Sequence, residues 1–107
     1  MIRMWRSGVE TDPARGPGAD HPLVRWGEGV FETMRAVGAD LPLGERHLDR
    51  MLSSLASLSI PEPPGRGDLE QALAALQTGA VGPSRIRLTA AAGRTVIGER
   101  VPAAELP

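Results

Sequence analysis

The sequence of 107 residues contains no lysine and no cysteine, and its only aromatic residues are two tryptophans and one phenylalanine. The missing cysteine excludes disulfides and thiolate metal sites. All 12 basic residues are arginines. Lysine is normally among the commonest residues, so its absence is informative; a coding bias towards GC-rich codons, which also favours Ala, Gly and Pro, is its simplest explanation. With so little aromatic area, aliphatic side chains and alanine must fill the core.

No strong charge and no long apolar run marks this chain. The formal net charge is -1 and the arginines are scattered, so no global field attracts nucleic acid or an anionic membrane. No apolar run approaches the length of a membrane span. Residues 1–8 carry Arg3 and Arg6 and do not resemble a signal peptide. We therefore expect a cytoplasmic protein with one domain at residues 1–101 and a linker-like tail at 102–107.

Strands are expected where apolar and polar residues alternate. In residues 85–90, Ile86, Leu88 and Ala90 alternate with polar residues, which is typical of a half-buried strand. Further strands are predicted at residues 1–5 (an edge strand), 28–37 and 95–101. A turn at 38–40 and a short return strand at 41–43 complete a predicted hairpin. Residues 8–21 read as a loop.

Two helices are expected between these strands. In residues 44–59 an apolar stripe recurs at helical spacing, formed by Leu48, Met51, Leu52, Leu55 and Leu58. In residues 68–78, Asp68 and Gln71 have the spacing of an N-cap and its capping-box partner, and Gly79 is expected to end the helix in a left-handed conformation. The sequence therefore predicts an α+β fold, a small antiparallel sheet with two helices packed on it.

Two motifs carry a family resemblance. The run Arg-Trp-Gly-Glu-Gly-Val-Phe-Glu-Thr-Met-Arg at 25–35 is followed by Glu-Arg-His-Leu-Asp-Arg at 45–50, with a second patch at 86–93. They resemble the N-terminal small domain of the class IV (fold type IV) pyridoxal-phosphate aminotransferases. That family includes branched-chain and D-amino-acid aminotransferases and aminodeoxychorismate lyase. Its cofactor, pyridoxal 5′-phosphate (PLP), is held as a Schiff base on a lysine of a second domain.

The resemblance implies roles for four residues. Arg50 resembles the helix arginine of the family's His-x-x-Arg pattern, which contacts the cofactor phosphate, and a guanidinium suits phosphate oxygens. Trp26 and Phe31 resemble aromatic residues that line the substrate pocket, although packing in the core or in the hairpin would explain them equally. Arg87 resembles an arginine at the substrate side, a natural carboxylate ligand; an exposed strand charge is the alternative.

Other residues of the motifs have plainer interpretations. His47 is expected to be structural, because the family's acid–base group is the lysine, and Glu28 and Glu32 are interpreted likewise. Ala91-Ala92-Gly93 stands where many relatives have Thr-Arg-Gly, in which the arginine traps the carboxylate of D-amino-acid substrates. Its loss argues against that substrate class, and Arg94 lies beyond the glycine. We expect no catalytic residue and no metal site in this chain.

Two functional hypotheses follow. In the first, the chain is the small domain of a class IV aminotransferase or lyase, inactive by itself because the lysine-bearing domain is absent, and that domain comes from another polypeptide or has been lost. In the second, it is a non-catalytic remnant that acts as a protein-interaction or anion-binding module. Under either hypothesis we expect an oligomer, because the face that would meet the missing domain should expose apolar groups.

Overall fold

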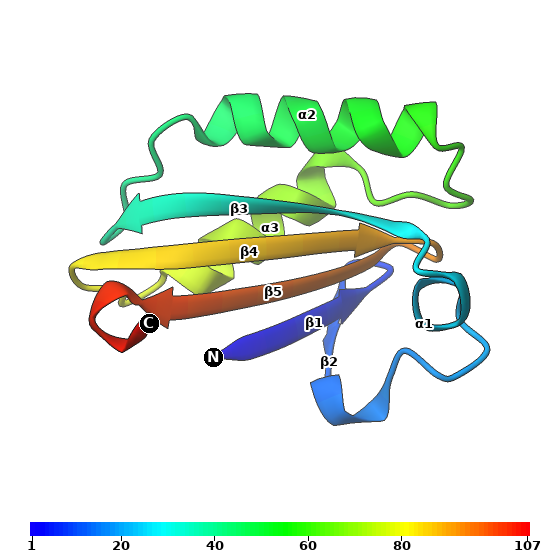
Figure 1. Cartoon of the computed structure of the whole chain (residues 1–107), viewed down its shortest axis with the longest axis horizontal. Helices are drawn as coiled ribbons and strands as arrows, with labels where there is room; N and C mark the ends of the chain where they lie inside the picture. Colours follow the sequence, from blue (N-terminus) through cyan, green and yellow to red (C-terminus); the bar gives the residue numbers. More distant parts are fainter.

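A five-stranded antiparallel sheet carries two long helices on one face (Figure 1). The computed structural model describes residues 1–107. Along the chain the elements are β1 (Ile2–Arg6), β2 (Val9–Thr11), η1 (Pro13–Arg15), α1 (Pro22–Trp26), β3 (Gly29–Val37), α2 (Gly44–Ser57), α3 (Arg66–Gln77), β4 (Pro83–Ala91), β5 (Thr95–Pro102) and η2 (Ala103–Glu105). The strand order is β2-β1-β5-β4-β3. The predicted α+β fold class is confirmed.

The core lies between the sheet and the pair α2 and α3. The alternation predicted for β4 is confirmed, since Ile86, Leu88 and Ala90 are fully buried on the face towards the helices. The stripe predicted for α2 is buried opposite them at Leu48, Met51 and Leu55, but Leu52 is only partly buried and Leu58, just past the end of the helix, is 60% exposed. On α3, Leu69, Leu73 and Leu76 are buried. Trp5 is the one aromatic residue in this core. Aliphatic side chains therefore supply most of the packing, as the composition requires.

A residue with a positive φ follows each of the helices α2 and α3. After α2, Ser59 adopts a left-handed conformation (φ 52°), and the N–H of Ile60 donates to the carbonyl of Leu55 at 3.2 Å. This pattern is a Schellman-type cap. Gly79, with φ 72°, follows α3 as predicted. The start of α3 corrects a prediction, because Asp68 is not the N-cap: Gly65 is, and the Asp68 carboxylate accepts its backbone N–H at 2.9 Å.

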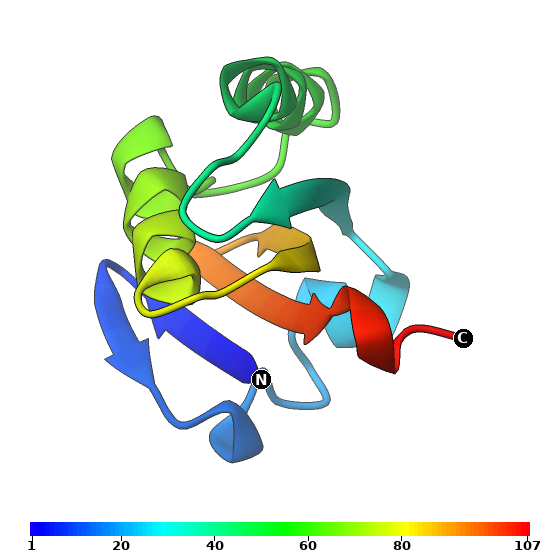
Figure 2. The same ribbon diagram turned by 90° about the vertical axis from the view of Figure 1, so that its left-hand side faces the viewer.

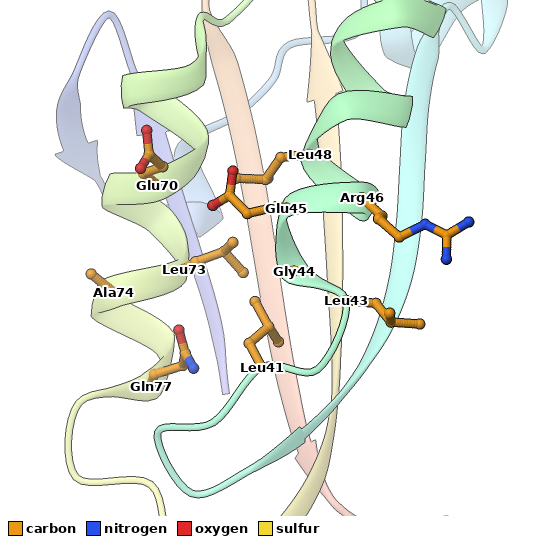
Figure 3. Close-up of a pocket in the computed structure, with 10 residues that line it drawn as sticks. All are labelled: Leu41, Leu43, Gly44, Glu45, Arg46, Leu48, Glu70, Leu73, Ala74 and Gln77. Atoms are coloured by element: carbon orange, nitrogen blue, oxygen red, sulfur yellow. The ribbon is translucent and has the colours of Figure 1, made fainter.

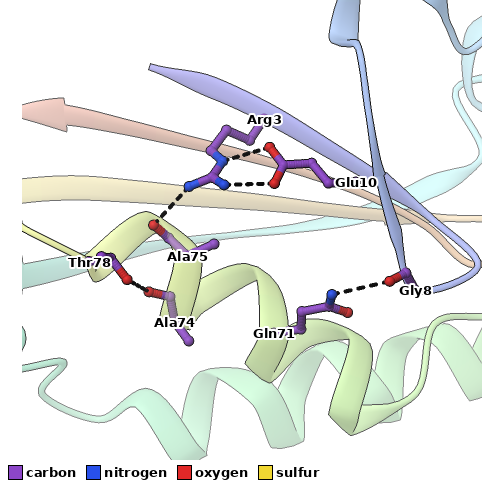
Figure 4. Close-up of polar contacts among 7 residues, drawn as sticks. All are labelled: Arg3, Gly8, Glu10, Gln71, Ala74, Ala75 and Thr78. Carbon is purple, nitrogen blue, oxygen red and sulfur yellow. Dashed lines mark hydrogen bonds and ion pairs between the residues drawn. The ribbon is translucent and has the colours of Figure 1, made fainter.

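The N-terminal region also differs from the prediction. Residues 8–21 are not all loop, since β2 pairs with β1, which is therefore an inner strand and not an edge. Ser7 and Gly8, with φ of 51° and 79°, join the two strands in a two-residue turn, and turns with two positive φ values match the twist of a hairpin. Figure 4 shows how this hairpin is tied to α3: Arg3 bonds to Glu10 and to the Ala75 carbonyl, and Gln71 donates to the Gly8 carbonyl.

The predicted return strand at 41–43 is wrong. Only an isolated bridge between Val37 and Asp40 follows β3. Pro42 has no N–H to give to a ladder, and Leu43 is left-handed (φ 62°) at the start of α2. β3 is consequently a free edge of the sheet.

The face of the sheet opposite α2 and α3 is called the outer face here. Figure 2 shows the two-layer arrangement, with α1 and the C-terminal segment on this side. α1, which the sequence analysis missed, covers one end of the outer face. The tail forms η2 beside β4, where Ala103 and Leu106 line a hollow of about 410 Å³ with Arg35 and Arg85. None of the helices combines the length and the apolar character needed to cross a bilayer.

Candidate functional site

Arg50 lies on the helix side of the free edge strand and is held by Glu32 of β3. Its Nε donates to Glu32 Oε1 at 2.6 Å and its Nη2 to Oε2 at 3.2 Å. Nη2 also lies 3.2 Å from His47 Nδ1, one turn earlier on α2. Because arginine can only donate, Nδ1 of His47 is the acceptor in this contact. The Glu32 carboxylate thus fixes the plane of the guanidinium.

The local sequence explains this arrangement. Arg50 lies off the buried stripe of α2, so its side chain leaves the core. Glu32 shares the helix-facing side of β3 with Met34 and Ala36, which are buried, but lies nearer the N-terminal end of the strand, where the residues are less buried. The Glu32 side chain is 15% exposed and that of Arg50 66% exposed. The carboxylate is therefore largely enclosed, while the guanidinium reaches solvent.

The Arg50 guanidinium keeps donors free for an anion. Its Nη1 makes no hydrogen bond within the protein, so both of its hydrogens point to no partner. A guanidinium that is oriented by one carboxylate and still has free donors is prepared for an anion. The prediction placed Glu32 as structural, and the geometry makes it the group that orients Arg50. The role of Arg50 at a phosphate stays a prediction.

Phe31 and Arg87 meet on the outer face. The Arg87 guanidinium carbon lies 4.2 Å from the centroid of the Phe31 ring. Phe31 pairs with Thr89 and Arg87 with Thr33, so the contact crosses the β3–β4 ladder diagonally. Phe31 is 59% exposed and is therefore outside the core. The guanidinium is held by stacking on the ring and has no carboxylate partner.

Trp26 lies on α1 and is 65% exposed. The guanidinium carbon of Arg25 is 4.8 Å from its ring centroid. Neither Trp26 nor Phe31 is therefore part of the core, and packing on the surface of the hairpin stays the alternative to a place in the pocket. The structure brings Phe31 and Arg87 together. Arg50 lies on the opposite face of β3, because it bonds to Glu32, and the neighbouring side chains of Phe31 and Glu32 point to opposite faces of the sheet.

The outer face holds two arginines that the sequence analysis did not single out. Arg35 and Arg85 are direct cross-strand partners on β3 and β4. Like charges in that position oppose each other, and Glu99, 3.5 Å from Arg85, is the carboxylate that offsets them. The alternation of β4 indicated that Arg85 faces outwards, but its pairing with Arg35 depends on the register, which the sequence did not show.

Arg94 is committed elsewhere. It bonds to Asp68 on α3 through Nε at 3.1 Å and Nη2 at 2.7 Å. This bonding, more than the added contact from the Gly65 N–H, holds the pKa of Asp68 below its usual range. The pair fixes the β4–β5 turn to the helix layer. Arg94 therefore does not replace the arginine that Ala92 displaces in the motif.

A cavity lies between the start of α2 and α3, and none of the four predicted site residues lines it. Its volume is about 460 Å³. Figure 3 shows Leu41, Leu48 and Leu73 among the residues that line it, while the side chain of Arg46, at its rim, points away from α3. The cavity and the candidate site are thus separate features.

The sheet order and the paired motifs define a known class of domain. The family model for amino-transferase class IV matches residues 29–105. The chain belongs to the class IV aminotransferase family. No curated protein matches it significantly.

Solved structures show the same fold. A hypothetical aminotransferase from Mycobacterium tuberculosis in a PLP-bound form is 25% identical, with a TM-score of 0.71 over 97% of this chain and 41% of that one. A putative 4-amino-4-deoxychorismate lyase is 28% identical, with a TM-score of 0.71 over 91% and 39%. The 4-amino-4-deoxychorismate lyase of Pseudomonas aeruginosa, at 24% identity and a TM-score of 0.67 over 97% and 41%, supports the fold alone. The chain thus spans about two fifths of the length of these structures.

Proposed function

We propose that residues 1–107 act as the small domain of a PLP-dependent class IV aminotransferase or aminodeoxychorismate-lyase-like enzyme. In this proposal Arg50 binds the cofactor phosphate, and Trp26, Phe31 and Arg87 line the substrate pocket. The lysine that holds the cofactor comes from outside these residues, which contain none. The observation that carries the proposal is the Glu32-oriented guanidinium of Arg50 with its free Nη1 donors.

Each residue has a definable task. PLP, when bound, supplies an electron sink for bonds at the α-carbon of an amino acid. Arg50 would donate from Nη1 to phosphate oxygens, and Glu32 would keep the guanidinium from turning away. Arg87, stacked on Phe31, would present its outer N–H groups to a substrate carboxylate. Exposed Trp26 and Phe31 would exclude water once a second domain covers them.

The same exposed surface indicates where a partner domain would bind. The lysine-bearing domain would lie against the edge strand β3, because Arg50 and the Phe31–Arg87 pair flank that strand on its two faces. Trp26 and Phe31, both more than half exposed, would be covered there. This contact makes association with that domain, and through it an oligomer, the expected state.

One observation favours the second hypothesis, a non-catalytic anion-binding module. Arg35, Arg85 and Arg87 share the outer face with Glu99 alone as a neighbouring carboxylate on the paired strands. Such a face attracts anions without any cofactor. The two hypotheses differ in whether PLP and a lysine-bearing domain accompany the chain.

The test is isolation of the protein from its native host, with intact mass measurement of every co-purifying polypeptide and an absorbance scan for PLP. The proposal expects a class IV lysine-bearing domain, on the same or another polypeptide, together with the cofactor absorbance. A lone, colourless chain would overturn it and leave the anion-binding module. In that case, inorganic phosphate titrated into the chain should shift the NMR signals of Arg35 and Arg85.

A further inference from the structure

His21 joins two separate parts of the outer face. Its Nδ1 accepts the backbone N–H of Leu23 at 3.0 Å, which caps the start of α1. Its Nε2 lies 3.0 Å from the carbonyl oxygen of Ala92 in the turn between β4 and β5. One side chain therefore both starts α1 and fastens it to the sheet.

The two contacts select one protonation state. The N–H of Leu23 can only donate, so Nδ1 must carry a lone pair. The carbonyl of Ala92 can only accept, so Nε2 must carry the hydrogen. Only the neutral imidazole with its proton on Nε2 makes both bonds. A second proton would sit on Nδ1 and face the Leu23 N–H, and the cap would be lost.

α1 depends on such contacts. It has five residues, and a helix of that length does not hold itself together in water. Leu23 packs it onto the outer face, where an ideal Cβ built on Gly29 would lie 2.7 Å from Leu23 Cδ1 and 3.8 Å from the Ala91 Cβ. Cap and packing together place α1 over this end of the sheet, and α1 carries the exposed ring of Trp26.

We propose that neutral His21 caps and positions α1, and with it Trp26, and that protonation of His21 removes the cap and loosens the start of α1. Asn, Asp, Ser and Thr are the usual N-caps, and their side-chain oxygens accept the backbone N–H throughout the range around neutral pH. Histidine changes its charge between about pH 5 and pH 8. The bond from the Leu23 N–H is made while the ring is neutral and is lost when Nδ1 takes a second proton.

The ionisable groups on the adjoining segments leave this change to His21. Those groups are Asp20 beside it in the chain, Arg25 on α1, Glu28 before β3, Arg94 in the β4–β5 turn, which is paired with Asp68, and Glu62, whose carbonyl accepts the Arg94 N–H. Arginine and carboxylate side chains do not ordinarily change charge between pH 5 and pH 8. The chain has two histidines, and the other, His47, lies on α2 on the opposite face. His47 therefore serves as the internal control.

The test is NMR of the whole 107-residue chain, without cofactor, at a series of pH values from 5 to 8. Long-range proton–nitrogen correlation reports which ring nitrogen of His21 carries the proton. Amide hydrogen exchange, corrected for its intrinsic pH dependence, reports the protection of the Leu23 N–H. We expect the Nε2–H form at pH 8 and a fall of about fivefold in Leu23 protection towards pH 5, the equilibrium factor of a typical N-cap.

Three variants test whether His21 acts through its protonation state or only as a structural residue. His21→Asn keeps a capping oxygen and should make Leu23 protection independent of pH. His21→Ala should lower protection at every pH, and His47→Gln should leave the wild-type profile unchanged. The proposal is overturned if wild-type protection does not follow His21 titration, if His21→Asn keeps the pH dependence, or if the ring carries its proton on Nδ1 at pH 8. Its consequence for substrate, through Trp26, rests on the proposed function, but these readouts need no cofactor and fail independently of it.

Discussion

Gly98 on β5 is a position where an added side chain would clash with the core, and Gly98→Ala tests the packing of α3 on the sheet. An added Cβ would lie 2.6 Å from Leu76 Cδ1 and 3.4 Å from both Leu76 Cγ and Leu88 Cδ2. Ordinary carbon contacts are about 3.5–4.0 Å, so the Leu76 side chain, α3 or β5 must shift by roughly 1 Å. Leu76 and Leu88 are both fully buried, so any such shift disturbs the packing of their core neighbours.

The expected cost is that of one overpacked methyl group, about 1–3 kcal/mol of unfolding free energy. Urea unfolding followed by circular dichroism measures it. With a slope of about 1–3 kcal/mol/M, the midpoint should fall by roughly 1 M. Gly67→Ala is the matched control: nothing lies within 4 Å of its added Cβ in α3, and it should stabilise the chain by up to about 1 kcal/mol.

A double-mutant cycle identifies the clash as the cause. Leu76→Val removes the Cδ1 atom nearest the new methyl group, so Gly98→Ala should cost at least about 1 kcal/mol less in that background than in the wild type. Equal costs in the two backgrounds, or a Gly98→Ala chain as stable as the wild type, would refute the packing argument.

Three further predictions concern charge, orientation and the core. Asp68 has a lowered pKa in the folded chain, so its stabilisation is complete above its unfolded value of about 3.9 and is lost as the pH falls through the lower folded value. Asp68→Asn, which removes the charge that pairs with Arg94, should therefore cost about 1 kcal/mol at pH 7 and progressively less towards pH 2 in urea unfolding; a cost that does not change with pH would contradict this. Glu32→Gln should leave the charge of Arg50 but weaken its orientation, raising the dissociation constant of the isolated complex for PLP by about threefold to tenfold; an unchanged constant would show that Glu32 does not orient Arg50. Trp5→Ala should destabilise the chain by about 3–5 kcal/mol in the same unfolding assay, and a loss below 1 kcal/mol would mean that its ring is not part of the core.

The sequence predicted those parts of the fold that repeat with a regular period. The alternation through Ile86, Leu88 and Ala90 and the apolar stripe through Leu48, Met51 and Leu55 identified their elements, because burial on one side imposes those periods. It missed β2, whose three residues are too few to show alternation, although the Ser-Gly turn before it was a usable signal. The return strand at 41–43 failed because two apolar residues around a proline resemble a strand without being able to pair.

The sequence pointed to the residues of the candidate site but not to how they are arranged. The motifs pointed to Arg50, Phe31 and Arg87, and the structure shows free donors on the first and a stacked pair of the other two. That Glu32 orients Arg50, and that Arg35 opposes Arg85, follows from the register of β3 with β4 and from the packing of α2. Those relations join residues far apart in the sequence, so no local pattern reveals them.

The most direct test of the account is the affinity of the native, lysine-containing complex for PLP, titrated by absorbance with the wild-type chain, with Arg50→Met and with Arg46→Met. Arg46 lies on α2 but points away from α3 beside the separate cavity, so it controls for loss of a helix arginine. The account predicts that Arg50→Met raises the dissociation constant by about 10- to 100-fold, the loss of one or two charge-assisted hydrogen bonds, and that Arg46→Met leaves it unchanged. Equal affinity for all three chains, or a complex that binds no PLP, would contradict the assignment of Arg50 and with it the proposed role of this domain.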